Sequence, residues 1–174
     1  TIATYTADGL RTTSGVEIPA DVVVTATGLE LLLMGGCVLS VDGVEVDPTQ
    51  TVAYKGMMLT GLPNFAFAVG YTNASWTLKC DLVSRYVCRL LDELDASGND
   101  VVMPVPPDDP QRLPLLDLSS GYIQRAIASL PTQGIRPPWR IYQNYRKDVR
   151  LLVHGPVVDE GVRYSRLAHS AERS

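Results

Sequence analysis

The chain has 174 residues, of which 45% are hydrophobic and 20% charged, an ordinary composition for one globular domain. Its formal net charge of −4 argues against the basic surface by which proteins bind nucleic acid or anionic membranes. The most apolar stretch, residues 29–41, is too short and too interrupted to cross a bilayer, so we expect no membrane segment.

Cysteine and histidine usage gives no metal or disulfide pattern. Cys37, Cys80 and Cys88 show no Cys-x-x-Cys spacing, and the last two lie too far apart on a helical pattern to bond. We predict that they are small reduced core residues, which is typical of a cytoplasmic protein. His154 and His169 have no partners at metal-ligand spacing, so no metal site is expected.

The opening third is rich in β-branched residues and predicts strands. Residues 2–6 are β-prone from the start, as if the chain began within a sheet, so we expect a fragment of a longer protein. Residues 16–18 alternate as a further strand. Residues 22–26, an unbroken apolar run, predict a strand covered on both faces, as in a parallel α/β sheet. The run ends at Thr27 and Gly28, where glycine permits a sharp turn or close approach to a ligand.

The middle of the chain predicts short strands. Residues 37–41 and 44–46 flank an Asp-Gly pair and predict a hairpin. Two more strands are expected at residues 54–60 and 65–70, separated by a turn over residues 61–64.

Residues 77–94 give the clearest helical pattern, with a wide apolar stripe. Candidate N-caps precede it or open it, and Ser-Gly at residues 97–98 ends it. Near its start, Lys79 and Asp81 are interpreted as ordinary surface residues.

The last third changes character. Residues 103–114 contain five of the twelve prolines and predict an extended surface connection. A short helix is expected to follow Ser119 and Ser120 and to end at Pro131. A second helix is expected over residues 139–153 and a final strand over residues 162–165, before a frayed tail from residue 168 to residue 174.

Two places could carry chemistry: the strand-to-glycine junction at residues 21–28 and the loop at residues 70–76. A helix start exposes unpaired N–H groups and about half a positive charge, which suits an electron-rich ligand edge. Glycine, small polar residues and Trp76 would add close approach, hydrogen bonds and a flat apolar wall. A capped core helix with a packing tryptophan explains the same pattern, and neither place holds a nucleophile–base pair.

The same two places resemble a known family. Residues 21–28, Asp-Val-Val-Val-Thr-Ala-Thr-Gly, resemble the motif by which flavoprotein monooxygenases pass from their NADPH domain back to their FAD domain. Residues 54–79 are more specific and resemble the flavin-proximal segment of the Baeyer–Villiger subgroup that includes the mycobacterial ethionamide-activating enzyme. Residues 130–134, 138–140 and 143–145 also resemble that subgroup's C-terminal region.

The resemblance implies FAD and NADPH as cofactors. It also implies O2 and a small ketone or sulfur-containing substrate, with one oxygen atom inserted beside a carbonyl or onto a heteroatom. The flavin would carry the hard chemistry while the protein positions the substrate and excludes water. The residues that the resemblance places at the cofactor are Thr27, Gly28, Thr72, Asn73, Ala74, Ser75, Trp76 and Thr77.

Other requirements of the family are not met within this sequence. It contains no Gly-x-Gly-x-x-Gly fingerprint, and the family's active-site arginine would fall upstream of Asp21, so no catalytic residue is assigned. We expect an N-terminal part of roughly 300 further residues, at about 150 per nucleotide-binding domain. The chain alone is expected to be inactive and not to bind FAD tightly.

The predicted fold is therefore mixed α/β, the C-terminal fragment of a flavoprotein with two dinucleotide-binding domains. Residues 1–28 would end the NADPH-binding domain and cross back, residues 29–100 would complete the FAD-binding domain, and residues 101–174 would form a Pro-rich helical extension. Two alternatives stay open: a related flavoprotein N-hydroxylase or reductase, and a non-catalytic interaction module that retains the fold.

Overall fold

The computed structural model describes residues 1–116 and 120–167, and the chain divides into two compact units, Thr1–Glu30 and Leu31–Ser174. The first unit is a three-stranded antiparallel sheet of β1 (Ile2–Thr6), β2 (Gly9–Thr12) and β3 (Glu17–Pro19), in that order. The predicted strand at residues 2–6 is confirmed, and the predicted strand near residues 16–18 corresponds to β3.

The predicted strand at residues 22–26 is wrong for this structure. These residues have no regular secondary structure and are exposed, with Val22 at 79% and Val24 at 84% of full exposure. Apolar β-branched residues favour a strand only when neighbouring strands pair with them and cover their faces, and no described residue does so here. Gly28 has a φ of 84°, which favours glycine, but the chain makes no turn or bend at this residue.

The second unit opens with two antiparallel hairpins. β4 (Ser40–Val41) and β5 (Val44–Glu45) flank Asp42 and Gly43, both with positive φ as a two-residue hairpin turn needs, so that prediction is confirmed. β6 (Ala53–Tyr54) pairs with β7 (Met58–Leu59) across a tight reversal at Lys55 and Gly56, also at positive φ. The single strand predicted over residues 54–60 is therefore replaced by two short strands, β6 and β7. The strand predicted over residues 65–70 is wrong, because these residues have no regular secondary structure.

Helix α1 (Trp76–Ser97) is the long helix that the apolar stripe predicted, and it ends at the left-handed Gly98. Its stripe packs against the fully buried segment 51–60 and against β8 (Val101–Pro104), which pairs with β11 (Val162–Ser165). The predicted strand at residues 162–165 is thus confirmed. A second apolar cluster lies around Leu59, Leu62, Leu115 and Leu130.

The Pro-rich segment runs from β8 to β9 (Leu113–Pro114), which pairs with β10 (Thr132–Gln133). α2 (Gly121–Ala126), with Ser120 as its N-cap, continues into a 3-10 turn at Ile127–Ser129, as predicted in outline. Ser119 and the predicted frayed tail at residues 168–174 lie outside the described residues.

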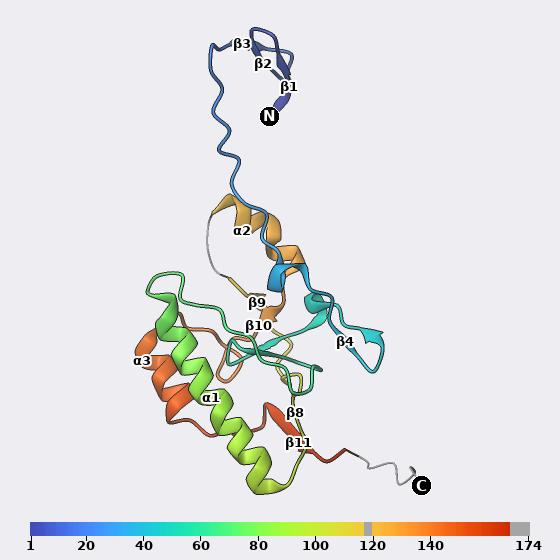
Figure 1. The fold of residues 1–174 in the computed structure, drawn as a ribbon, viewed down its shortest axis with the longest axis vertical. Helices are drawn as coiled ribbons and strands as arrows, with labels where there is room; N and C mark the ends of the chain where they lie inside the picture. The colour runs from blue at the N-terminus through green and yellow to red at the C-terminus, as the bar shows by residue number, and fades with distance from the viewer. Residues whose placement is uncertain (117–119, 168–174) are drawn as a thin grey trace. The chain divides into compact units, whose positions relative to one another are not determined.

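The second predicted helix begins later than residue 139. α3 spans Tyr145–Asp148 and continues as one π-helical turn, Val149–Val153, while residues 139–144 are irregular. Asn144 starts the helix because its side-chain oxygen accepts the N–H of Lys147 at 3.1 Å. α3 and its π turn lie side by side with α1 (Figure 1).

The prediction that the cysteines are core residues is wrong, since Cys37 and Cys88 are exposed and Cys80 is half-buried. All three are free thiols.

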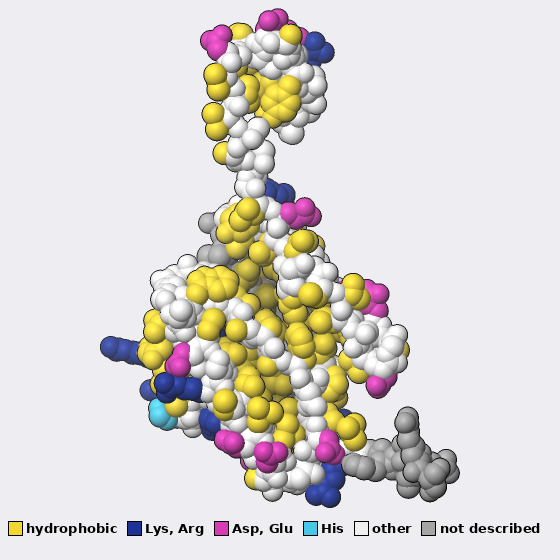
Figure 2. All heavy atoms as spheres, viewed as in Figure 1, with side chains coloured by type: hydrophobic (Ala, Val, Ile, Leu, Met, Phe, Trp, Pro, Cys, Tyr) yellow, Lys and Arg dark blue, Asp and Glu magenta, His cyan; other side chains and the backbone are white. Residues whose placement is uncertain are grey.

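Charged side chains lie mostly at the margins of the face in Figure 2, and hydrophobic side chains gather along its middle over the second unit. In the described part of the chain, no helix is both long enough and apolar enough to cross a membrane.

Candidate functional site

The entrance to α1 is an exposed loop. Residues 72–78 are all exposed, and the N-cap Ser75 bonds the hydroxyl of Thr77 at 2.8 Å instead of a backbone N–H. The first N–H groups of a helix have no partner within the helix and carry a partial positive charge, so this loop presents hydrogen-bond donors to solvent. The entrance is not packed into the molecule's own interior.

Trp76 stands at the edge of this loop with 59% of its surface exposed. Its indole lies directly on the backbone of Gly70, where an added Cβ would come within 2.3 Å of the ring. Only glycine fits at this position. One edge of the indole therefore packs on the Gly70 backbone, and the rest of the ring surface is open to solvent. The flat apolar wall predicted beside the loop is present, and a fully packed core tryptophan is excluded.

Gln143 holds the loop from one side. Its Oε1 accepts the backbone N–H of Thr72 at 3.0 Å and the Thr72 hydroxyl at 3.3 Å, and its carbonyl accepts Asn73 Nδ2 at 3.2 Å. Gln143 itself has a φ of 49°, an unusual conformation for a residue with a side chain.

A buried charged cluster lies beneath the loop. Asp148 Oδ2 accepts the Tyr71 hydroxyl at 2.7 Å and pairs with Lys79 Nζ at 3.1 Å, and all three residues are less than 5% exposed. Burial lowers the pKa of Lys79, and the Asp148 carboxylate works against that shift. Burial also raises the pKa of Tyr71, with the hydrogen bond to Asp148 adding to it.

The interpretation of Lys79 as a surface residue is therefore wrong. Lys79 falls on the same stripe of α1 as Leu82, Val83 and Tyr86, which faces the interior. The interpretation of Asp81 is confirmed, because it forms an exposed pair with Arg85 one turn later.

A groove of about 260 Å³ adjoins the loop. Its walls are mainly apolar, from Leu115, Leu116 and Ile141, with the amides of Gln133 and Gln143 and the guanidinium of Arg140 as polar groups. Thr72 and Asn73 border it, so the groove and the α1 entrance share an edge. Such a mixture of apolar walls and few polar groups suits a small organic molecule.

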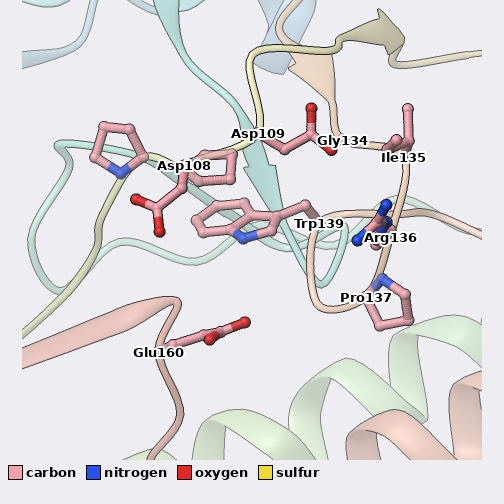
Figure 3. Close-up of a pocket in the computed structure, with 10 residues that line it drawn as sticks. Asp108, Asp109, Gly134, Ile135, Arg136, Pro137, Trp139 and Glu160 are labelled. Atoms are coloured by element: carbon pink, nitrogen blue, oxygen red, sulfur yellow. The ribbon is translucent and has the colours of Figure 1, made fainter.

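Another cavity, of about 200 Å³, contains none of the predicted site residues. Figure 3 shows the carboxylates of Asp108 and Glu160 around the Trp139 indole, with Arg136 beyond it. In the described ranges 1–116 and 120–167, no group of three or more His, Cys, Asp and Glu residues could hold a metal ion.

Six of the eight predicted cofactor residues are consecutive and form the exposed entrance to α1, of which Trp76 and Thr77 are the first two residues: Thr72, Asn73, Ala74, Ser75, Trp76 and Thr77. Thr27 and Gly28 lie in the first unit and are exposed there. The cofactor role of all eight stays a prediction. Gln143, Tyr71, Lys79 and Asp148 were not predicted as site residues.

Comparison with known proteins identifies the relatives of this chain. An FAD-containing monooxygenase, EthA, of Mycobacterium tuberculosis is 53% identical over 167 residues, which is 95% of this chain and 34% of that protein. The EthA of Mycolicibacterium smegmatis is 49% identical over 177 residues, 100% of this chain and 36% of that protein. The chain is a relative of the EthA-like FAD-containing monooxygenases. AlmA of Acinetobacter baylyi, named a probable FAD-binding monooxygenase, is 38% identical over 99% of this chain and 35% of that protein.

These matches confirm the resemblance to the EthA-like subgroup that the sequence motifs indicated. The chain spans about a third of the length of the curated EthA-like relatives that it matches. No family model matches the chain, and no solved structure matches it.

Proposed function

We propose that this chain forms the C-terminal, FAD- and substrate-side portion of an NADPH- and O2-dependent monooxygenase of the Baeyer–Villiger type. Its substrates would be small ketones or sulfur compounds. The observation that carries the proposal is the exposed loop 72–77, which lies within the segment shared with proteins named FAD-containing monooxygenases.

The loop fits the electron-rich edge of a flavin. Backbone N–H groups at the start of a 22-residue helix would donate to it and stabilise negative charge on its reduced form. When bound, the flavin would supply the oxygen-transfer chemistry. Thr27 and Gly28 are proposed as further cofactor contacts from the sequence resemblance alone.

The adjoining groove would receive the substrate. Leu115, Leu116 and Ile141 would hold its apolar part and exclude water, and Trp76 would border the reacting space. The NADPH fingerprint and the catalytic arginine would come from other parts of the enzyme, so this chain alone would be inactive.

The test uses a full-length, FAD-loaded enzyme that contains this chain, with Asn73→Ala or Trp76→Ala. We expect weaker FAD binding for Asn73→Ala. For Trp76→Ala we expect about a tenfold rise in the share of NADPH oxidation that yields hydrogen peroxide instead of oxygenated product, because a misplaced substrate loses reactivity steeply. Leu91→Ala, also an exposed apolar residue of α1, is the matched control.

Unchanged FAD affinity and unchanged product yield in both variants would refute the placement of the flavin. Product analysis also separates the alternatives: an N-oxygenated product or NADPH oxidation without oxygenation would favour an N-hydroxylase or a reductase. A protein that binds no FAD would leave only the non-catalytic module.

A further inference from the structure

The loop at the α1 entrance has little apolar burial to hold it in place. Every residue from Thr72 to Leu78 is exposed, and small polar residues predominate. A segment with few buried apolar contacts opens easily unless other contacts fix it. The contacts that fix this loop therefore decide the geometry of the candidate flavin site.

Those contacts come from one short segment near the end of the chain. Gln143 receives three hydrogen bonds from Thr72 and Asn73 on the exposed side of the loop. Five residues later, Asp148 receives the Tyr71 hydroxyl and pairs with Lys79 on the buried side. Tyr71 directly precedes the loop, Thr72 and Asn73 are its first two residues, and Lys79 lies two residues after Thr77.

The backbone of this segment is built to make both contacts. Gln143 has a left-handed φ of 49°, which costs about 1 kcal/mol or more for a residue with a side chain. The extended Asn144 then caps α3, so that Asp148 lies on its inner face. A strained residue followed directly by a helix cap persists only where the surrounding contacts compensate for it.

We infer that residues 143–148 act as a clamp on the α1 entrance, with Gln143 and Asp148 as positioning residues for the candidate flavin site. This inference rests on the proposed function for its meaning, but the contacts exist without a cofactor. The clamp holds the N–H groups of residues 72–77 in one arrangement before any ligand binds. Preorganised donors lose less free energy on binding than donors that must first be ordered.

Amide hydrogen exchange of the whole protein, without and with FAD, tests the clamp. Gln143→Ala removes the two hydrogen bonds that Gln143 Oε1 accepts from Thr72 but leaves the backbone carbonyl that accepts Asn73 Nδ2. We expect the Thr72 amide to exchange about fivefold to tenfold faster, as the loss of a hydrogen bond of about 1 kcal/mol implies. The second half of α1, from Tyr86 onward, should exchange as before. Gln111→Ala, an exposed glutamine of the Pro-rich segment, is the matched control.

Two further substitutions separate positioning from general stability. Gln143→Glu keeps an acceptor oxygen for Thr72 and should restore slow exchange. Asp148→Asn keeps an acceptor for Tyr71 but leaves the Lys79 ammonium without its counter-charge, so exchange in the loop should again accelerate. Asp81→Asn makes the same chemical change on the exposed face of α1 and should have no effect.

With FAD bound, Gln143→Ala should broaden or shift the flavin absorption bands and weaken FAD binding, and Gln143→Glu should reverse the loss of binding. Unchanged loop exchange in Gln143→Ala would overturn the clamp, as would equal acceleration along all of α1. If Asp148→Asn fails to fold, Gln143→Ala and Gln143→Glu still decide the question. A full-length wild-type enzyme that binds no FAD would refute the proposed function, while the exchange rates would still decide the clamp.

Discussion

Two lysine–aspartate pairs in the second unit each contain a buried lysine, but they differ in their surroundings. Lys55 Nζ contacts Asp159 Oδ2 at 3.0 Å, the Tyr86 hydroxyl at 2.7 Å and the Pro156 carbonyl at 2.8 Å. Its three N–H donors therefore all have partners, and it also lies over two tyrosine rings.

Lys79 has a single charged partner, Asp148, which is shared with Tyr71. This pair lines a small void together with Gly70, and the void and the groove have several lining residues in common. Burial lowers the pKa of both lysines, and in each case the aspartate opposes that shift. The comparison shows that one pair closes the core while the other supports an exposed loop, so we expect global effects from the first and local effects from the second.

The largest effect is expected at the core pair. Asp159→Ala leaves the fully buried Lys55 ammonium without its counter-charge and removes an acceptor from Tyr54, which should reduce the free energy of unfolding by about 3–5 kcal/mol. Urea unfolding measures this loss, with Asp81→Ala as an exposed control expected to stay within about 0.5 kcal/mol. A loss below about 1 kcal/mol, or faster exchange at the α1 entrance alone, would contradict the distinction between the pairs.

Alkaline pH should weaken both clusters through their tyrosines. Burial raises the pKa of Tyr54, Tyr71 and Tyr86 above the ordinary value of 10, so the stability that they contribute is complete below pH 10 and is lost as pH rises further. In Tyr71→Phe, the fall in the free energy of unfolding above pH 10 should be less steep by about 1.4 kcal/mol per pH unit, because unfolding then releases one proton fewer.

Unfolding midpoints in urea between pH 9 and pH 11 measure that slope. Comparing the slopes of the wild type and Tyr71→Phe separates the contribution of the tyrosine from that of the lysines. Because the pKa of each lysine is lowered in the folded state, the lysines make the protein more stable as pH rises from that lowered pKa to 10.5, the reverse of the tyrosine effect. Identical slopes in the two proteins would show that Tyr71 is not protonated more tightly in the folded state. Tyr164, whose pKa burial raises to about 12, is the internal reference in both.

The smallest effect is expected from the cap of α3. Asn144→Ala removes the acceptor for the Lys147 N–H and should cost about 1 kcal/mol. Because the cap lies between Gln143 and Asp148, the loss should appear at the α1 entrance and not around Lys55. Amide exchange at Thr72 and at residues 53–59 measures the two sides, and equal acceleration at both would remove the distinction.

The sequence predicted elements where local chemistry decides the backbone. The Asp42-Gly43 turn, the stripe of α1 and the Gly98 end each depend on residues adjacent in the chain. The reversal at Lys55 and Gly56 was missed although Gly56 is a local turn signal, because the apolar residues on both sides were read as one strand. The strand at residues 22–26 failed for the opposite reason: a buried strand needs partners, which periodicity within the chain does not supply.

The site divides in the same way. The loop 72–77 was found from its position before a helical pattern, but Gln143 and Asp148 lie about 70 residues further along the chain. Only the fold brings them to the loop. Lys79 did carry a local signal, since it occupies the apolar stripe of α1 with Leu82, Val83 and Tyr86.

The exposed valines at residues 22–24 also matter for handling the chain on its own. An extended, uncharged β-branched run with open backbone groups is a template for pairing with the same run in another molecule. In concentrated solutions, intermolecular association would begin there, far along the sequence from the α1 entrance. Apparent affinities and sedimentation coefficients of the isolated chain would then report self-association through residues 22–24 instead of a property of the cofactor loop.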